Sequence, residues 1–426
     1  MSILLLFVFI AGYLAIAFEH PLRLNKAASA LITGVLCWTI YIVQSSGDSH
    51  TVTEELLHHL GEIASILFFL LGAMTIVELI DTHNGFDIIT RYISTSSKSK
   101  LLLLVTIITF FLSALLDNLT TAIVMASLCA KLLKAKEDKL WFCGVIVIAA
   151  NAGGAWSPLG DVTTTMLWIG GQITALNIMK QLILPSLVVC AIPAFIVWYR
   201  FRGQQIEKLM MPESSAEEKM DGKIIMISGI GFLIFVPVFK TVTHLPPFMG
   251  MLLALGLMWV ITTLLHKRKD PELAEKFNVA KALQKVDSPS ILFFLGILLA
   301  VSALQSAGLL QDGAAWLSEK LGNDYLIGSV LGLLSAVVDN VPLVAASQGM
   351  YDLQTYPTDH PFWEFLALTT GTGGSAIIIG SAAGVAVMGI EKIDFIWYLR
   401  KISWLALIGF AGGIAVFLLQ MQFWFL

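Results

Sequence analysis

The stretch Ser113-Ala114-Leu115-Leu116-Asp117-Asn118 recurs later in the chain as Ser335-Ala336-Val337-Val338-Asp339-Asn340. Each copy lies in the middle of an apolar run that is long for one membrane-spanning helix and short for two. An acidic side chain at the centre of a spanning helix costs about 2.5–3.5 kcal/mol, so a regular helix through each Asp-Asn pair is unfavourable. We therefore predict two re-entrant hairpins that turn at these pairs and return to the side from which they came. The predicted hairpins cover residues 101–133 and 325–351.

The composition indicates that lipid is the solvent around most of the chain. The 426 residues are 57% apolar before glycine is counted, whereas soluble domains reach about 45–50% with glycine included. Charged residues make up 13%, the net charge is −4 and no basic stripe is present, so we expect no nucleic-acid partner. The four cysteines lie in apolar runs without a CxxC pair and are predicted to be small buried hydrophobic side chains. The sequence thus predicts an all-α polytopic protein embedded in a lipid bilayer.

Ten membrane crossings and the two hairpins account for the apolar runs. With the N-terminus outside, every lysine and arginine except Lys180, Lys240 and Lys320 falls in a loop assigned to the cytoplasm, as the positive-inside rule requires. Residues 2–18 are apolar and are followed rather than preceded by basic residues, which favours an uncleaved anchor over a signal peptide. This arrangement places both termini outside.

The repeat extends beyond the hairpins. The segment Ser-Ile-Leu-Phe-Phe-Leu at 65–70 recurs at 290–295, and the Gly-Gly pair at 153–154 recurs at 373–374. Because each half has an odd number of predicted crossings, the second half is predicted to be inverted relative to the first. Each half also has a crossing broken by glycines, at 141–170 and 362–390. The predicted domains are a first repeat at 1–200, a cytoplasmic linker at 201–222 and a second repeat at 223–426.

Three aspartates, Asp117, Asp161 and Asp339, lie in apolar surroundings. Asp161 is the last residue of the stretch 151–161, whose three glycines and one proline are not expected to continue a regular helix. Unwound carbonyl groups in such breaks bind small cations in transporters. No Lys or Arg lies inside these segments, and oxygen-rich surroundings with excess negative charge favour a hard cation. A carboxylate can hold a proton or a cation but not both, so the hypothesis is a shared site in which the two compete. The predicted ion- and proton-binding residues are Asp117, Asn118, Asn151, Asp161, Thr163, Thr164, Asp339 and Asn340, with sodium at Asp117, Asp161 and Asp339 and with the asparagines as neutral oxygen ligands.

Further polar residues are predicted to play secondary roles. Ser381 stands in the second half where Asp161 stands in the first, so the site is predicted to be asymmetric. Glu62 and Glu78 flank the third crossing and are expected at the membrane interface or in a vestibule rather than as ligands. The eight histidines fall in loops or at the ends of crossings, where we expect solvated side chains. The secondary residues are Ser113, Ser335, Ser375, Ser381, Glu62 and Glu78.

Four motifs in order resemble the NhaD-type sodium/proton antiporters of the ion transporter superfamily. They are SALLDNLTTAIV at 113–124, NAGGAWSPLGDVTTTMLW at 151–168, SAVVDNVPL at 335–343 and GTGGSAIIIGSAAGVAVMG at 371–389. The resemblance implies a sodium- or lithium-for-proton exchanger of bacterial inner membranes that needs no cofactor besides its transported ions. It also implies scaffold spans around a transport domain that holds the hairpins, often in a homodimer, and it places the functional polar positions on the residues named above.

Two alternatives are weighed against this reading. An anion transporter of the same superfamily, for dicarboxylates or arsenite, is disfavoured because aspartates at the hairpin tips would repel an anionic substrate. An intramembrane aspartyl protease would use two membrane aspartates, but its usual GxGD context is absent and both Asp117 and Asp339 are followed by asparagine. Cation transport without enzymatic activity is therefore the expected function.

Overall fold

The computed structural model describes residues 2–17, 19–22, 24–44, 49–86, 95–206, 216–267 and 277–424. The regular secondary structure of this part of the chain is helical, apart from one isolated bridge between Ser97 and Gln205. The helices of the first half are α1 (Ser2–Ala17), α2 (Glu19–Leu22), α3 (Lys26–Gln44), α4 (Ser49–Thr82), α6 (Lys98–Leu116), α7 (Asn118–Leu132), α8 (Lys136–Ala155), α9 (Val162–Ile169) and α10 (Ala175–Arg200). Those of the second half are α11 (Ala216–Thr243), α12 (Pro247–His266), α14 (Val279–Lys285), α15 (Ser288–Ser306), α16 (Leu309–Leu321), α17 (Asp324–Leu334), α18 (Asn340–Met350), α19 (Pro361–Gly373), the 3-10 helix η1 (Ile378–Gly380), α20 (Ala382–Glu391), α21 (Phe395–Lys401) and α22 (Ser403–Trp424).

Eight of the described helices are long and apolar enough to cross a membrane. All of them except α6 belong to the predicted crossings, and α6 is the first arm of the first predicted hairpin. The run at 141–170 forms α8 and α9, and the run at 362–390 forms α19 and α20, each pair separated by a non-helical or 3-10 segment. All four cysteines are buried, as their apolar surroundings predicted.

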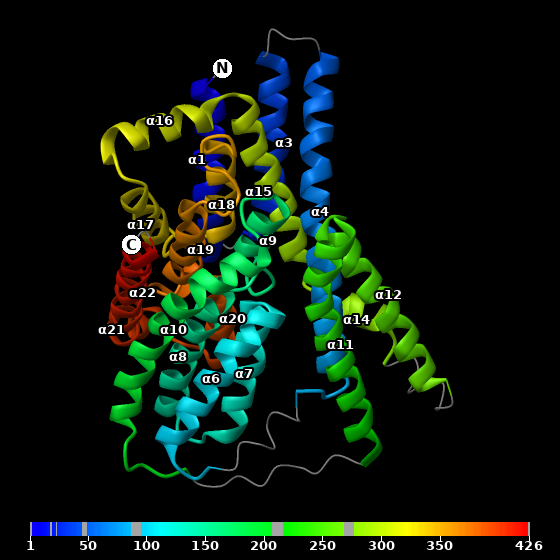
Figure 1. Cartoon of the computed structure of the whole chain (residues 1–426), viewed down its shortest axis with the longest axis vertical. Helices are drawn as coiled ribbons and strands as arrows, with labels where there is room; N and C mark the ends of the chain where they lie inside the picture. The colour runs from blue at the N-terminus through cyan, green and yellow to red at the C-terminus, as the bar shows by residue number, and fades with distance from the viewer. Residues whose placement is uncertain are drawn as a thin grey trace.

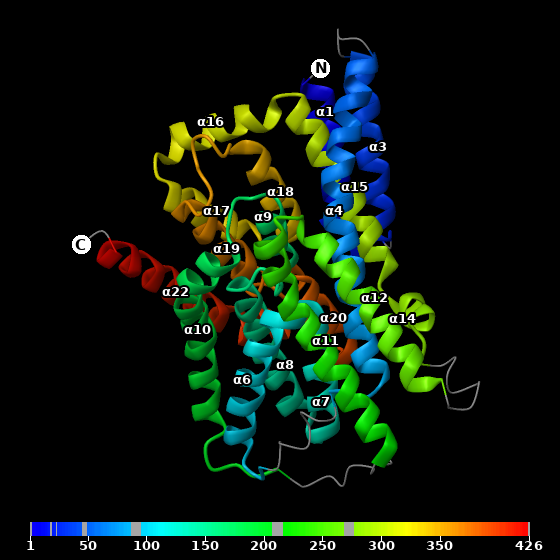
Figure 2. The ribbon, with the colours of Figure 1, turned by 45° about the vertical axis from the view of Figure 1, so that its right-hand side comes forward.

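The helices form two groups that face each other (Figures 1 and 2). In one group α3 packs along α15, α1 lies against α3, and α12 packs on both α4 and α11. The other group is built from α6 with α8, α17 with α19, α10 with α22, and α7 with α20. Helices α3 and α15 approach closely where Gly34 meets Gly296, since neither residue has a side chain. The approach is so close that a side chain at Gly296 would overlap the backbone of Ala30.

Equivalent positions in the two halves make equivalent contacts. A side chain on Gly153 of α8 would overlap the carbonyl oxygen of Phe110 on α6, and one on Gly373 of α19 would overlap that of Gly332 on α17. The hydroxyl of Ser113 donates to the carbonyl oxygen of Ala150 (2.6 Å), and that of Ser335 donates to the carbonyl oxygen of Thr370 (2.7 Å). Each broken helix is thus fastened to a hairpin arm in the same way, which supports the two-repeat interpretation; the inverted relation of the halves stays a prediction.

The positions of helices differ from the sequence-based expectations in three places. Helix α4 begins at Ser49 rather than near residue 62 and has 34 residues, about 50 Å at 1.5 Å per residue, so it extends beyond a bilayer core. Helix α16 forms at 309–321, where the sequence is too polar to have been read as a crossing. The predicted linker at 201–222 contains the first turns of α11, and its residues 207–215 lie outside the described part of the chain.

The expectation of solvated histidines is wrong for His83 and His266. Both side chains are buried, and their Nε2 atoms lie 2.9 Å apart. The Nδ1 atom of His83 is 2.7 Å from the carbonyl oxygen of Leu79, which can only accept, so this nitrogen carries the proton. The two imidazoles join the end of α4 to the end of α12.

Candidate functional site

Asp161 lies at the centre of the candidate site. It is 2% exposed and precedes the first turn of α9, where its Oδ1 atom accepts a hydrogen bond from the backbone nitrogen of Thr163 (3.0 Å). This is the usual N-cap arrangement, in which a carboxylate satisfies the free N–H groups at a helix N-terminus. Helix α8 continues through Gly153 and Gly154, contrary to expectation, and the break that contains Pro158 and Gly160 ends at this deeply buried carboxylate.

The asparagines of both repeated Asp-Asn pairs donate to the Asp161 carboxylate. The Nδ2 atom of Asn118, on the first turn of α7, lies 2.9 Å from Asp161 Oδ2. The Nδ2 atom of Asn340, on the first turn of α18, lies 3.2 Å from the same oxygen. The two hairpins, one from each half of the chain, thus meet at a single carboxylate.

Asn151 extends this network to the second broken helix. Its Oδ1 atom accepts from Asn118 Nδ2 (3.0 Å), and its Nδ2 atom donates to the hydroxyls of Ser375 (2.9 Å) and Ser381 (3.0 Å). The first half therefore contributes the carboxylate and the amides of Asn118 and Asn151, and the second half contributes the amide of Asn340 and the two hydroxyls. This is the asymmetry expected from the Asp161 and Ser381 pair.

Asp117 and Asp339 also begin helices, but with different backbones. Asp117 has φ 79° and ψ 156°, a region that favours glycine, and its carboxylate accepts from the backbone nitrogen (2.8 Å) and the hydroxyl (2.9 Å) of Thr120. Asp339 has an unstrained backbone (φ −49°, ψ 137°) and its carboxylate lies 3.4 Å from the backbone nitrogen of Val341. The repeated Asp-Asn sequence therefore adopts two conformations.

All three aspartates line one small cavity between the two groups of helices. Its volume is about 60 Å³. Apolar side chains, including several of α4 and Phe294 of α15, make up most of its wall. Its polar wall residues besides the three aspartates are Lys26, Asn118, Thr165, Ser290 and Asn340. We call it the central cavity. Within the described residues, no three His, Cys, Asp or Glu side chains converge closely enough to bind one metal ion jointly. Binding of one sodium by the three aspartates together stays a prediction.

The other predicted site residues fall into three kinds. Asn118 and Asn340 turn their Nδ2 atoms toward Asp161, so in this conformation they act as donors rather than as oxygen ligands. The Thr164 hydroxyl donates to the Asp161 carbonyl oxygen (2.9 Å). The buried Thr163 hydroxyl has no hydrogen-bond partner among the described residues, and Thr163 walls neither the central cavity nor the two larger cavities described below. Ser113 and Ser335 bond backbone carbonyl groups and fasten helices.

Glu62 and Glu78 lie away from the central cavity. Glu62 is near His58 and His59 (3.6 and 3.4 Å) and lines a larger cavity of about 380 Å³. We call this cavity the His59 vestibule. Glu78 forms an ion pair with Lys285 (3.0 Å) and accepts from the Thr82 hydroxyl (3.0 Å), which fastens α14 to α4. Glu62 thus has the expected vestibule position, and Glu78 has a structural ion pair.

The chain is similar to known transport proteins along most of its length. The family model described as citrate transporter (CitMHS) matches residues 13–371. Sodium/proton antiporter 1 of Arabidopsis thaliana is 49% identical over 412 residues, which cover 96% of this chain and 70% of that protein. The Na+/H+ antiporter NhaD of Vibrio cholerae is 31% identical over 445 residues, which cover 97% of this chain and 91% of that protein.

This chain belongs to the NhaD-type antiporter family. Among solved structures, the YdaH transporter of Alcanivorax borkumensis aligns with a TM-score of 0.60 over 94% of this chain and 98% of that one, at 11% identity. That likeness shows a shared fold. The NhaD-type chain is accordingly an α-helical multi-pass membrane protein.

The central cavity of this family member is connected more closely with one side of the protein than with the other. A second cavity of about 350 Å³, which we call the Asp339 vestibule, shares wall residues with the central cavity. These shared residues are Lys26, Leu119, Ser290, Asp339 and Ala382. The central cavity and the His59 vestibule have no wall residue in common. The conformation is therefore one in which the site faces the Asp339 vestibule.

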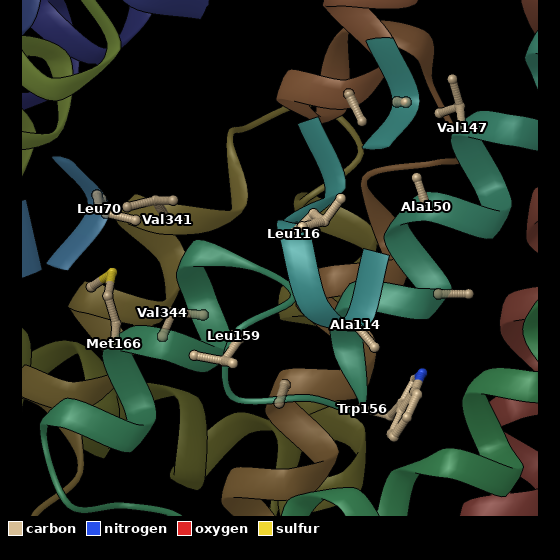
Figure 3. Packing of buried hydrophobic residues seen from close by; sticks show 14 of the residues in the cluster. Leu70, Ala114, Leu116, Val147, Ala150, Trp156, Leu159, Met166, Val341 and Val344 are labelled. Carbon is tan, nitrogen blue, oxygen red and sulfur yellow. The ribbon is translucent and has the colours of Figure 1, made fainter. Parts of the chain in front are cut away.

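An apolar plug closes the other side. Leu70 of α4 and Val341 of α18 both wall the central cavity, and Figure 3 shows them next to each other. One turn further along α9 and α18, Met166 and Ala345 line the His59 vestibule. About one helical turn therefore separates the central cavity from the His59 vestibule. The Leu70 side chain in this barrier is buried, with 7% of its surface exposed.

Sequence reasoning missed the residues of α3, α4 and α15 that wall the central cavity. The repeat of 65–70 at 290–295 is visible in the sequence, but its place in the site is not. Ser290 walls the central cavity and the Asp339 vestibule, and its counterpart Ser65 walls the His59 vestibule. Lys26 was assigned to a loop, yet it walls the central cavity. The repeat itself was the signal that could have indicated the paired serines.

Proposed function

We propose that this chain exchanges sodium or lithium for protons, with the two species competing at the Asp161 carboxylate. The observation that carries the proposal is that this buried carboxylate, held by Asn118 and Asn340, faces a cavity with two further aspartates. A carboxylate in such surroundings needs a positive partner, and either a proton or a small cation can provide it. Since one must leave before the other binds, the two fluxes are coupled.

The size and charge of the central cavity support a small cation as cargo. Sites for drug-sized organic ligands measure about 300–1,000 Å³, whereas the central cavity measures about 60 Å³. Three carboxylates in its wall would also repel citrate, dicarboxylates and arsenite. Oxygen ligands with excess negative charge favour a hard cation. Although the matched family is described as citrate transporters, its relatives cited above carry the name of sodium/proton antiporters, and we infer no enzymatic activity.

We further propose that the protein lies in a bacterial inner membrane with both termini outside. The positive-inside distribution of lysine and arginine supports this orientation, and the NhaD relative from Vibrio cholerae supports a bacterial setting. With this orientation the Asp339 vestibule opens inward and the His59 vestibule outward. The homodimer implied by the family resemblance stays a prediction.

The experiment that tests the function uses purified protein in proteoliposomes with a pH-sensitive dye inside. Sodium or lithium chloride added outside should move protons out of the vesicles, and potassium chloride at the same ionic strength serves as the control. Citrate and succinate, added as potassium salts, should have no effect. Sodium-dependent uptake of labelled citrate or succinate without proton counterflow would instead favour the anion-transport alternative.

A further inference from the structure

Lys26 is the one basic side chain among the described residues that wall the central cavity or the Asp339 vestibule. It is the first residue of α3 and belongs to the wall that the two cavities share. The carboxyl groups in these walls are Asp117, Asp161 and Asp339 around the central cavity, with Glu19 and Asp287 in the vestibule. A single ammonium group thus stands where a cation would pass between an acidic cavity and its acidic entrance.

The Lys26 ammonium group is held by an aromatic ring rather than by a carboxylate. Its Nζ atom lies 4.8 Å from the ring centroid of Phe293, a fully buried residue of α15. Its backbone nitrogen donates to Glu19 Oε1 (3.3 Å), and no salt bridge joins its ammonium to an acidic group in the described part of the chain. A cation–π contact of this kind is modest, so it holds the ammonium group less firmly than a buried salt bridge would.

The nearby phenol of Tyr13 is a further sign that this wall is built for polar contacts. Tyr13 of α1 walls the Asp339 vestibule together with Lys26 and Asp339. Its buried hydroxyl has no hydrogen-bond partner among the described residues, and such groups cost stability unless a ligand or water satisfies them. This wall therefore contains an unpartnered hydroxyl besides the Lys26 ammonium group.

We propose that Lys26 is a positioning residue that acts as a built-in competitor of the transported cation. Its positive charge weakens sodium binding in the central cavity and so allows release into the Asp339 vestibule. When the site is empty, the same charge compensates part of the carboxylate charge. Phe293 holds the ammonium back from the carboxylates and thereby limits the competition. This inference rests on the proposed cation exchange and adds to it the residue that sets the affinity for sodium.

The test compares two variants with opposite expected effects. Lys26→Gln removes the competing charge, so the sodium concentration for half-maximal proton flux should fall on the order of tenfold. The reason is that repulsion between the ammonium group and a bound sodium ion is only partly screened by water in this wall. In Phe293→Leu the ammonium is no longer held by the ring, and the same concentration should rise. Lys26→Arg should stay near the wild-type value. A loss of packing alone would not give shifts of opposite sign.

Lys285→Gln is the matched control, because Lys285 pairs with Glu78 and walls none of the three cavities. Its half-saturating sodium concentration should be unchanged. Protection of each purified variant against heat by sodium chloride, relative to choline chloride, reports binding even where transport is lost. The inference is overturned if Lys26→Gln binds sodium no more tightly than the wild type. Absence of sodium-driven proton flux in the wild type would instead overturn the proposed function.

Discussion

The Nδ2 atom of Asn340 lies 3.2 Å from the Oδ2 atom of Asp161, although 179 positions separate the two residues in the chain. Asn118, the counterpart of Asn340 in the first half, donates to the same oxygen at 2.9 Å. One carboxylate therefore joins two hairpins and a broken helix. Any displacement of one hairpin relative to the other changes the surroundings of Asp161, which gives the protein a way to couple ion occupancy to conformation.

Asn340→Ala tests the contribution of the second hairpin. The substitution removes one of the two amide donors to Asp161, and hydrogen bonds to charged groups contribute about 1.5–3 kcal/mol. We expect sodium-driven proton flux to fall by about tenfold or more. Asn323→Ala is the control, because Asn323 caps α17 away from the cavity (Oδ1 2.8 Å from the Tyr325 nitrogen) and should lower thermal stability without changing sodium affinity. Sodium-driven proton flux in Asn340→Ala that equals the flux in Asn323→Ala, per folded protein, would contradict the assigned role of Asn340.

Gly153→Ala tests the close packing of the broken helix on its hairpin. The added methyl group would overlap the carbonyl oxygen of Phe110, which is backbone and cannot rotate away. We expect strongly reduced yield of folded protein and a lower denaturation temperature in detergent, as for overpacked interiors. Gly389→Ala is the control, since nothing outside the adjoining backbone of α20 lies within 4 Å of its added Cβ. Normal stability of Gly153→Ala would mean that α6 and α8 are not packed as described.

Leu70→Ala tests the apolar plug between the central cavity and the His59 vestibule. Removing most of this side chain should admit water through the barrier on the closed side and allow sodium to pass without a proton in exchange. The expected result is a sodium leak from loaded proteoliposomes in the absence of a pH gradient, measured with radioactive sodium. Leu257→Ala on α12, where the side chain is 40% exposed, is the control and should remain tight. A tight, fully coupled Leu70→Ala protein would show that the barrier lies elsewhere.

The pH dependence of sodium affinity tests the competition itself. If one proton and one sodium ion compete for the site, the half-saturating sodium concentration should rise as the pH falls, by about tenfold per pH unit where the protonated form predominates. Two protons per sodium would give about a hundredfold change per unit, so the slope also reports the stoichiometry. Initial rates of radioactive sodium uptake at a series of pH values measure this slope. A half-saturating concentration that does not vary with pH would rule out competition.

The sequence contained enough information for the local features of the site but not for its long-range contacts. Asp117, Asp161 and Asp339 could be found because a charged residue in an apolar run is visible without a structure. The break after Ala155 was predictable because glycine and proline disfavour a helix. The donation of Asn340 to Asp161 could not be predicted, because it depends on how the two halves pack.

The position of Lys26 and the length of α4 were hidden for a different reason. Charge counting assigns a lysine at the end of an apolar run to a loop, and it cannot show that the helix end faces a cavity inside the protein. The first turns of α4 carry His50, Glu54 and Glu55. These polar residues interrupt the apolar pattern by which a crossing is recognised, but they are compatible with a helix. Polarity marks where the bilayer ends, whereas helix length depends on backbone hydrogen bonds and packing.

The most direct test of the account is sodium-driven proton flux in proteoliposomes that contain Asp161→Asn. This substitution keeps the size of the side chain and removes the negative charge for which proton and sodium would compete. We predict that flux falls to the level of protein-free vesicles, while Asp312→Asn, on the first turn of α16 and outside the walls of the three cavities, behaves as the wild type. Wild-type flux in folded Asp161→Asn protein would contradict the proposal that this carboxylate is where the two ions compete.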